Sequence, residues 1–311
     1  TRGPATTSGP SRRSSRSAPD VDGWTALAQG SGFAALSWQN LVMFAVAGVL
    51  IYLAVRHQYE PLLLIPIGFG AVLANLPGAE LSASSGYVPE PGAGPALMQL
   101  IYEAGITTEL MPPLIFLGVG ALTDFRPLLA RPFTLILGAA AQVGIFVAAL
   151  GAHYVFGFEV REAASIGIIG GADGPTSIFL TAILAPELLG AVAVAAYSYM
   201  ALVPVIQPPI LRLLTSPAER EIPLGSERRV SRTVVILFPI AITLLVSLAV
   251  PPAAPLIGLL MFGNLLRESG VTDRLAKTAQ GPLVNIVTIL LGLVVGATMD
   301  GASFLRTETL F

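Results

Sequence analysis

The stretch "GIIGGADGPTSIFL", residues 167–180, decides how the rest of the sequence is interpreted. An acid, Asp173, lies inside an apolar run, with Gly-Gly at 170–171 before it and Gly-Pro at 174–175 after it. Glycine disfavours a helix by entropy, and proline removes an N–H and clashes with the preceding turn. We therefore expect two short helices that meet at Asp173, where backbone groups are freed from helical hydrogen bonds.

The composition is that of a membrane protein with several spans. Of 311 residues, 54% are hydrophobic and 12% are charged, whereas an ordinary globular domain has about 25% charged residues. The formal net charge of -2 comes with no basic stripe, so no nucleic-acid partner is expected. With no cysteine and two histidines, the chain has no means for disulfides or thiolate metal sites and little for a histidine-based catalytic triad.

Apolar runs recur along the chain after a leading segment, 1–36, whose Ser-, Arg-, Pro- and Gly-rich start predicts a disordered tail. A simple span needs ~20 apolar residues, so the shorter runs must tilt, be shielded by neighbours or extend into flanking sequence. The pattern predicts an all-α polytopic membrane protein. The runs are 37–55, 61–76, 109–122, 132–156, 163–184, 188–214, 233–250, 255–266 and 283–299.

Basic residues in short loops predict the orientation of the chain. The loop at 212–232 contains five arginines, and the segment 267–277 contains a further group of basic residues, so we assign both to the cytoplasmic side. If 163–184 crossed the membrane completely, the next run would deliver Arg212 to the outside. The charge pattern therefore favours a re-entrant pair of half-helices around Asp173.

Two weak matches in the same order predict an internal repeat. The segment 60–76 resembles 254–266 around a Phe-Gly pair, and 114–125 resembles 289–300 in the pattern Gly-Ala-x-x-Asp. In the assigned orientation the matched segments run in opposite directions, as in the inverted repeats that build transporter sites between two halves. Composition bias in Gly and Leu is the competing explanation.

The repeat also predicts a division of the chain. Residues 37–230 form a first membrane half with the broken helix, and residues 231–311 form the start of a second, incomplete half. Asp173 follows Asp124 by 49 residues, so a second broken helix is expected about 49 residues after Asp300, beyond the last residue. Either that second site element is missing from this chain, or the repeat is not real.

Hard oxygen ligands gather at the break. The Asp173 carboxylate, a freed carbonyl such as that of Gly171, and the hydroxyls of Thr176 and Ser177 form a set suited to a dehydrated sodium ion. The same carboxyl, if desolvated, can hold a proton instead. The competing explanation is that Asp173 only caps the second half-helix. An ionisable residue in a membrane segment costs ~2.5 kcal/mol or more, which makes a cap alone a weak reason to keep one there.

Two tyrosines and several asparagines are further candidates. Tyr197 and Tyr199, in "AAYSYMALVPVIQPP" at 195–209, could reach the carboxyl site with their hydroxyls or could anchor the helix at a membrane interface. Asn75 and Asn264, inside apolar runs, fit helix packing as well as ion binding.

Six segments, taken in order, resemble the beta subunit of the biotin-dependent sodium-pumping decarboxylases, which are of the oxaloacetate, methylmalonyl-CoA or glutaconyl-CoA type. The two most specific are "GIIGGADGPTSIFL" and "LAPELLGAVAVAAYSYMALVPVIQPPI". The others are "PLLLIPIGFG", "GVGALTDFRPLLA", "FGNLLRESGVTDRL" and "NIVTILLGLVVGA". The resemblance runs from about residue 37 to the last residue.

The resemblance implies a multi-pass subunit of the bacterial inner membrane. With an alpha subunit that holds the carboxyltransferase and biotin carrier, and with a small gamma subunit, it would decarboxylate the carrier's carboxybiotin, consume a proton and export sodium. Asp173, in the GGADGPT motif, would be the central sodium and proton carboxyl, and Tyr199, in the AYSYM motif, would belong to the pathway. The family has C-terminal segments that complete the site and lie beyond this chain, so the chain alone is expected to be inactive. A homo-oligomer is compatible with the resemblance.

Two other classes of function stay open. A sodium-coupled secondary transporter of an organic anion could share the broken helix and the repeat without decarboxylase activity. A non-catalytic membrane scaffold would need no ion site. Co-purification with a biotinylated protein would distinguish the decarboxylase from both, while the acid that feeds the carrier depends on another subunit.

Overall fold

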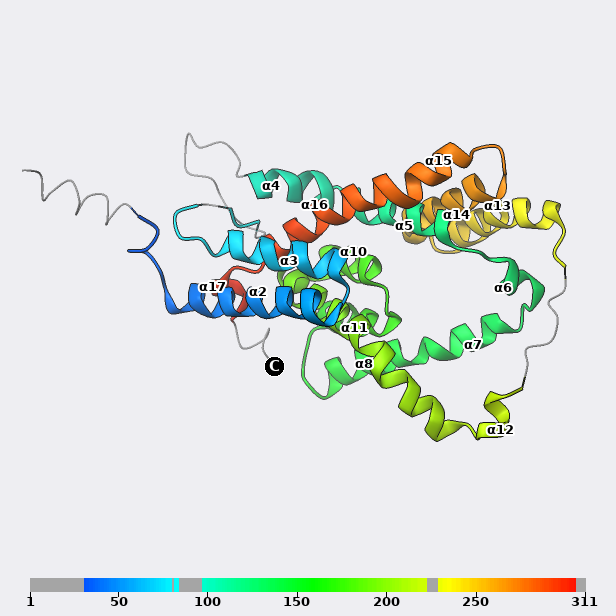
Figure 1. The fold of residues 1–311 in the computed structure, drawn as a ribbon, viewed down its shortest axis with the longest axis horizontal. Coiled ribbons are helices and arrows are strands. Elements are labelled where there is room, and N and C mark those ends of the chain that lie inside the picture. Colours follow the sequence, from blue (N-terminus) through cyan, green and yellow to red (C-terminus); the bar gives the residue numbers. More distant parts are fainter. Residues whose placement is uncertain (1–30, 80, 84–96, 223–228, 306–311) are drawn as a thin grey trace, which may run out of the picture.

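The computed structural model describes residues 31–79, 81–83, 97–222 and 229–305, and every regular element within these ranges is a helix (Figure 1). Four of the helices are long and apolar enough to cross a membrane, and two bent pairs raise the number to six. The predicted all-α polytopic membrane fold is confirmed for this part of the chain. Most of the predicted leading segment, residues 1–30, lies outside it.

Several of the helices are interrupted by tight 3-10 turns (η2, η3, η4) or wide π-helical turns (η1, η5). In chain order the elements are α2 (Trp38–His57), α3 (Pro61–Ala74), α4 (Leu97–Tyr102), η1 (Glu103–Thr107), α5 (Met111–Leu122), α6 (Arg126–Ala130), α7 (Thr134–Ala141), α8 (Val143–Tyr154), α9 (Val160–Gly167), η2 (Ile168–Gly171), α10 (Gly174–Leu184), η3 (Pro186–Leu188), α11 (Leu189–Leu214), α12 (Pro217–Arg220), α13 (Arg232–Ala249), η4 (Pro251–Ala253), α14 (Ala254–Glu268), α15 (Asp273–Thr278), η5 (Ala279–Leu283), α16 (Val284–Ala297) and α17 (Gly301–Phe304).

The four long apolar helices are α2, the pair α7–α8, α13, and the 25-residue helix 273–297 formed by α15, η5 and α16. A capping box at Ser37 begins α2, since its side chain accepts from Asn40 N while the Asn40 side chain accepts from Ser37 N. Most side chains of α7–α8 and α13 are exposed. Lipid tails are as apolar as these side chains, so this exposure suits helices that face a bilayer.

The third apolar run begins earlier than predicted. We expected it over 109–122, but α4 and η1 precede α5 and form with it a pair bent by 61°. The helix 97–107 was not predicted because two acidic residues interrupt the apolar sequence around it. Glu103 lies within η1, where its Oε1 accepts a hydrogen bond from Gln99 Nε2 at 3.0 Å. Glu109 lies at the bend in a left-handed conformation with φ 57.

The two predicted repeats pack through exchanged partners. Helix α3 packs on α16 and α5 packs on α14, so the first element of each half lies against the second element of the other half. At each crossing, the glycine of one helix contacts a backbone carbonyl of the other helix. That carbonyl belongs to the residue three positions before the other helix's own glycine, so the four contacts are related by an approximate two-fold symmetry. An added Cβ would overlap the carbonyl oxygen of Leu293 at Gly70, of Ile67 at Gly296, of Leu260 at Gly120 and of Leu117 at Gly263.

The Gly-Ala-x-x-Asp pattern also ends in the same turn in both halves. Arg126 N donates to Asp124 Oδ1 at 3.0 Å, and Ala302 N donates to Asp300 Oδ1 at 3.1 Å. Composition bias does not account for matched contacts, so they support the predicted repeat. The predicted division near residue 230 stays a prediction, because helices from both sides of it interlock.

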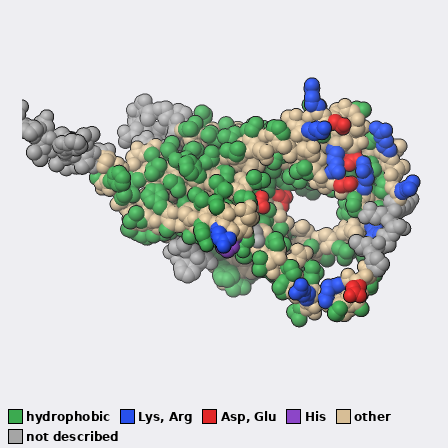
Figure 2. All heavy atoms as spheres, in the orientation of Figure 1, with side chains coloured by type: hydrophobic (Ala, Val, Ile, Leu, Met, Phe, Trp, Pro, Cys, Tyr) green, Lys and Arg blue, Asp and Glu red, His purple; other side chains and the backbone are tan. Residues whose placement is uncertain are grey.

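Basic side chains gather at one end of the molecule. Figure 2 shows Lys and Arg mainly over the end that carries α6, α12 and α15 in Figure 1, while hydrophobic surface covers most of the rest of this face. Such segregation is what the positive-inside rule requires. Helices α7 and α8 lead away from this basic end, and α11 leads back to it at α12 (Figure 1). The elements between them, α9, η2 and α10, start and finish away from the basic end, as a re-entrant pair does.

Candidate functional site

The helix breaks at Asp173, as the sequence predicts. After α9 tightens into η2, Ala172 adopts a left-handed conformation with φ 53, and Asp173 is extended before α10 begins at Gly174. Pro175 lies in the first turn of α10, where its missing N–H leaves no helical bond unmade. A left-handed alanine is sterically costly, so the surrounding packing must hold this turn in place.

The Asp173 carboxylate is half-buried, and in the described part of the chain its hydrogen-bond partner is Thr176. Thr176 Oγ1 donates to Asp173 Oδ2 at 2.6 Å. Asp173 is the N-cap residue of α10, and the Thr176 backbone N–H also points at this carboxylate without completing a cap hydrogen bond. No hydrogen bond reaches Oδ1 from the described part of the chain. This incomplete cap leaves oxygen lone pairs of the carboxylate for a cation or a proton.

The structure places the other predicted ligands around the same turn. Ser177 is buried, and both its N and its Oγ donate to the Asp173 carbonyl oxygen at 3.0 Å, so its hydroxyl is bonded to the backbone. Gly171 ends η2, and an added Cβ there would lie 3.9 Å from Gln142 Oε1. Gln142 lies at the junction of α7 and α8, and its side-chain amide oxygen near the break was not predicted from the sequence.

Tyr197, and not Tyr199, packs on the break. The Tyr197 side chain is fully buried, and an added Cβ at Gly174 would overlap its ring and hydroxyl. Gly174 is thus needed for this close approach. Side chains two residues apart on a helix differ in direction by ~200°, so Tyr199 lies on another face of α11, with 39% of its surface exposed. A pathway role for Tyr199 stays a prediction.

Two buried hydroxyl groups on these helices have no hydrogen-bond partner in the described part of the chain. They are Tyr197 Oη on α11 and Thr181 Oγ1 on α10. Gly174, Ser177 and Thr181 follow one another at helical spacing on one buried face of α10. A buried hydroxyl without a partner costs ~1–3 kcal/mol, which suits a path for ions. Thr181 was missed because a threonine in an apolar helix is ordinarily a packing residue.

The similarity to known proteins now identifies the family. Residues 39–311 match the family model described as Na+-transporting oxaloacetate decarboxylase beta subunit. The chain belongs to this family. It is 54% identical over 286 residues to the glutaconyl-CoA decarboxylase subunit beta of Acidaminococcus fermentans, an alignment that covers 92% of this chain and 73% of the relative. It is 53% identical over 297 residues to the methylmalonyl-CoA decarboxylase subunit beta of Propionigenium modestum, with 90% and 74% covered.

A third relative is the oxaloacetate decarboxylase beta chain 2 of Salmonella typhi, which is 46% identical over 340 residues, with 93% of this chain and 78% of the relative covered. As a member of the beta-subunit family, the chain is a membrane subunit of a sodium-translocating, biotin-dependent decarboxylase and acts as part of a complex. The family supports this prediction over the secondary transporter that was its alternative.

In this beta subunit the buried asparagines are packing residues. Asn75 Nδ2 donates to Met299 O at 2.7 Å, and Asn75 Oδ1 accepts from Gly301 N at 2.8 Å. Asn264 Nδ2 donates to Thr123 O at 2.9 Å. These bonds cross between α3 and the end of α16 and between α14 and the end of α5, so they hold the exchanged helix pairs together.

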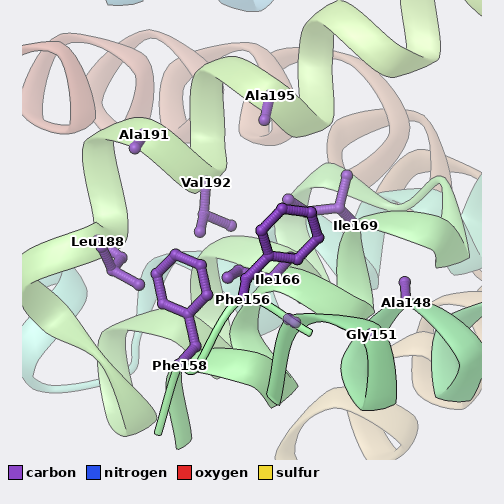
Figure 3. Close-up of a pocket in the computed structure, with 11 residues that line it drawn as sticks. Ala148, Gly151, Phe156, Phe158, Ile166, Ile169, Leu188, Ala191, Val192 and Ala195 are labelled. Carbon is purple, nitrogen blue, oxygen red and sulfur yellow. The ribbon is translucent and has the colours of Figure 1, made fainter. Parts of the chain in front are cut away.

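An apolar cavity of about 450 Å³ lies beside the break (Figure 3). Its lining comes from α8 and the loop after it, from α9 and η2, and from η3 and α11. Phe156 and Phe158 reach into it, and Ile169 of η2 borders it. Every lining side chain is apolar, so the cavity offers no side-chain hydrogen bond to an ion. The carboxylate and hydroxyl groups near this break are those of Asp173 and Thr176, which do not line the cavity.

Proposed function

We propose that Asp173 carries sodium and a proton in turn, and that this exchange couples the decarboxylation of carboxybiotin to sodium export. The observation that carries the proposal is the carboxylate itself: it lies at a helix break, accepts a hydroxyl bond from Thr176 and completes no cap hydrogen bond to α10. Backbone that is not helical is tolerated at membrane depth where it lines a cavity or is buried in protein, so the break has a reason only if it serves a site.

Sodium is the cargo, and its ligands come from the turn. The Asp173 carboxylate, the Thr176 hydroxyl oxygen and the Gly171 carbonyl are the proposed ligands. Ser177 would act through the Asp173 carbonyl, which its hydroxyl already binds. Carboxylate and carbonyl oxygens are hard donors of the kind that half-helix ends offer to sodium in transporters.

The proton closes the chemical balance. When sodium leaves, the Asp173 carboxylate takes up a proton and becomes neutral. The bond between the carboxyl carbon and the biotin nitrogen then breaks, carbon dioxide leaves, and the electron pair stays on the nitrogen. That nitrogen accepts the proton from Asp173, which restores the carboxylate for the next sodium ion. We place Tyr199 on the same pathway.

The other components follow from the family. We propose that an alpha subunit presents the carboxybiotin, that a small gamma subunit completes the complex, and that the complex lies in the bacterial inner membrane. The basic end in Figure 2 would face the cytoplasm, where a carrier protein is made and recharged.

Exchange of Asp173 for asparagine tests the proposal. In the assembled decarboxylase complex reconstituted in vesicles, Asp173→Asn should lower decarboxylation-driven sodium uptake by about a hundredfold or more, because it removes the charge that the cation pairs with. Asp124→Asn is the matched control: Asp124 lies outside the break, is partly exposed, and is 3.9 Å from Arg267 Nη2. Normal uptake by Asp173→Asn would falsify the assignment.

A further inference from the structure

A second cavity, which unlike the first has a polar lining, lies at the basic end and is formed by elements other than those of the break. It has a volume of about 400 Å³ and is formed where α6 and α13 begin and α14 ends. Its lining includes three arginines, one glutamate and two valines: Arg126, Arg232, Arg267, Glu268, Val230 and Val235.

The charges of this pocket do not cancel. Glu268 has a side chain only 3% exposed, and its Oε2 accepts from Arg126 Nη2 at 2.5 Å while its Oε1 lies 3.6 Å from Arg267 Nε. Three arginines and one glutamate leave a formal charge of +2 on the lining. If Asp124, 3.9 Å from Arg267 Nη2, is counted as well, +1 remains.

Most of the guanidinium donors in the pocket are unused by the described part of the chain. A guanidinium has five N–H donors. The Arg126 side chain makes one hydrogen bond, to Glu268, and is 55% exposed. The Arg232 side chain makes one, from Nη2 to Ser269 O at 3.1 Å. Arg126 and Arg232, which each use one donor in the described part of the chain, lie beside a third arginine and are suited to the oxygens of a phosphate, which guanidinium groups bind in a bidentate manner.

The depth of the pocket points to a lipid. Arg232 is the first residue of α13, which is one of the helices long enough to cross a membrane, so the guanidinium lies where the hydrocarbon begins. Directly along α13, Val234 and Leu237 are 47% and 55% exposed. A ligand with an anionic head and hydrocarbon tails would match the arginines and the apolar face together.

We propose that this pocket binds the phosphate of an anionic phospholipid of the cytoplasmic leaflet, with the acyl chains along the exposed face of α13. The site is separate from the broken helix and does not depend on the role of Asp173. A free phosphate ion shares the headgroup chemistry but would gain nothing from the apolar face.

Spin-labelled lipids measure this directly in the assembled complex. In phosphatidylcholine vesicles, the motionally restricted fraction of labelled phosphatidylglycerol should exceed that of labelled phosphatidylcholine several-fold. Arg232→Gln should lower this selectivity by roughly fivefold for the one lost charge. Arg220→Gln is the matched control, since Arg220 is on α12 at the basic end, bonds only to Thr215 within the described part of the chain and does not line the pocket; it should keep the selectivity.

Each other outcome overturns the proposal. Equal losses in Arg232→Gln and Arg220→Gln would mean a diffuse surface charge and no specific pocket. Absence of selectivity in the unmodified complex would mean that the pocket binds no lipid. Displacement of the labelled phosphatidylglycerol by inorganic phosphate at constant ionic strength would make the site one for a free anion, and co-purification of an acidic protein that masks it would make it a protein contact.

Discussion

Thr176 governs the carboxylate at the residue scale. Its hydroxyl donates to Asp173 Oδ2 at 2.6 Å, and because Thr176 lies in the first turn of α10 while Asp173 is the N-cap residue before it, the bond fixes the carboxylate relative to that helix. A bond of this kind to a charged group is worth ~1.5–3 kcal/mol. It also leaves the second carboxylate oxygen for the ion.

Two substitutions at this position separate the hydroxyl from the shape of the side chain. Thr176→Val keeps the branched shape and removes the donor, so the sodium concentration needed for half-maximal decarboxylation should rise about tenfold. Thr176→Ser keeps the hydroxyl and should stay within about twofold of the unmodified complex. If both variants behave alike, the hydrogen bond has no part in sodium binding.

At the element scale, the fold depends on helices that cross at close distance. Four glycines allow α3 to lie on α16 and α5 on α14, with backbone against backbone. Lipid tails are as apolar as the helix side chains, so the hydrophobic effect does not drive helices together in a membrane. Small residues favour association there because they let the backbones approach closely and gain van der Waals contact. Because these contacts are related by an approximate two-fold symmetry, equivalent glycines in the two halves should be equally intolerant of a side chain.

Alanine at Gly120 and at Gly296 tests this equivalence. In each case the added methyl group meets a backbone carbonyl, which cannot rotate away, so each variant should be destabilised by about 1–3 kcal/mol. Gly144→Ala, in α8, is the control because nothing lies within 4 Å of the added Cβ; it should be neutral or slightly stabilising. Thermal unfolding of the purified complex measures all three, and a tolerated change at one of the paired sites would contradict the exchanged packing.

The distribution of charge defines the whole molecule. Lys and Arg cover one end, and the helices that leave that end return to it after the re-entrant pair, so the break in α9–α10 approaches from the opposite side (Figures 1 and 2). This arrangement is compatible with the proposed ion site at Asp173 and with the proposed docking of a carrier on the basic side.

The absence of cysteine makes this polarity simple to measure. A single cysteine replacing Val155, an exposed residue after α8, should react with a membrane-impermeant maleimide in cells whose outer membrane alone is opened. One replacing Ala218, exposed on α12 at the basic end, should react only after the inner membrane is permeabilised. Labelling of both from the same side would contradict the topology.

Local chemistry explains how much could be predicted. The break at Asp173 depends on glycine and proline within a few residues, and the apolar runs depend on composition, so both were found in the sequence. The helix 97–107 was missed because Glu103 interrupts its apolar sequence. In the structure the Glu103 side chain is hydrogen-bonded by Gln99, a contact that the sequence pattern does not show. Thr181 was missed because its lack of a partner is a property of its surroundings.

The sequence by itself determined that this protein is a multi-span membrane protein, that a helix breaks at an acid, and which family it belongs to, since each of these depends on residue type and local order. Only the tertiary structure decided that Tyr197 packs on the break instead of Tyr199, that the repeats exchange partners, and that three arginines from separate helices line one pocket. Those features depend on which faces meet across large separations in the chain, and helical periodicity fixes the faces of a helix without fixing their partners.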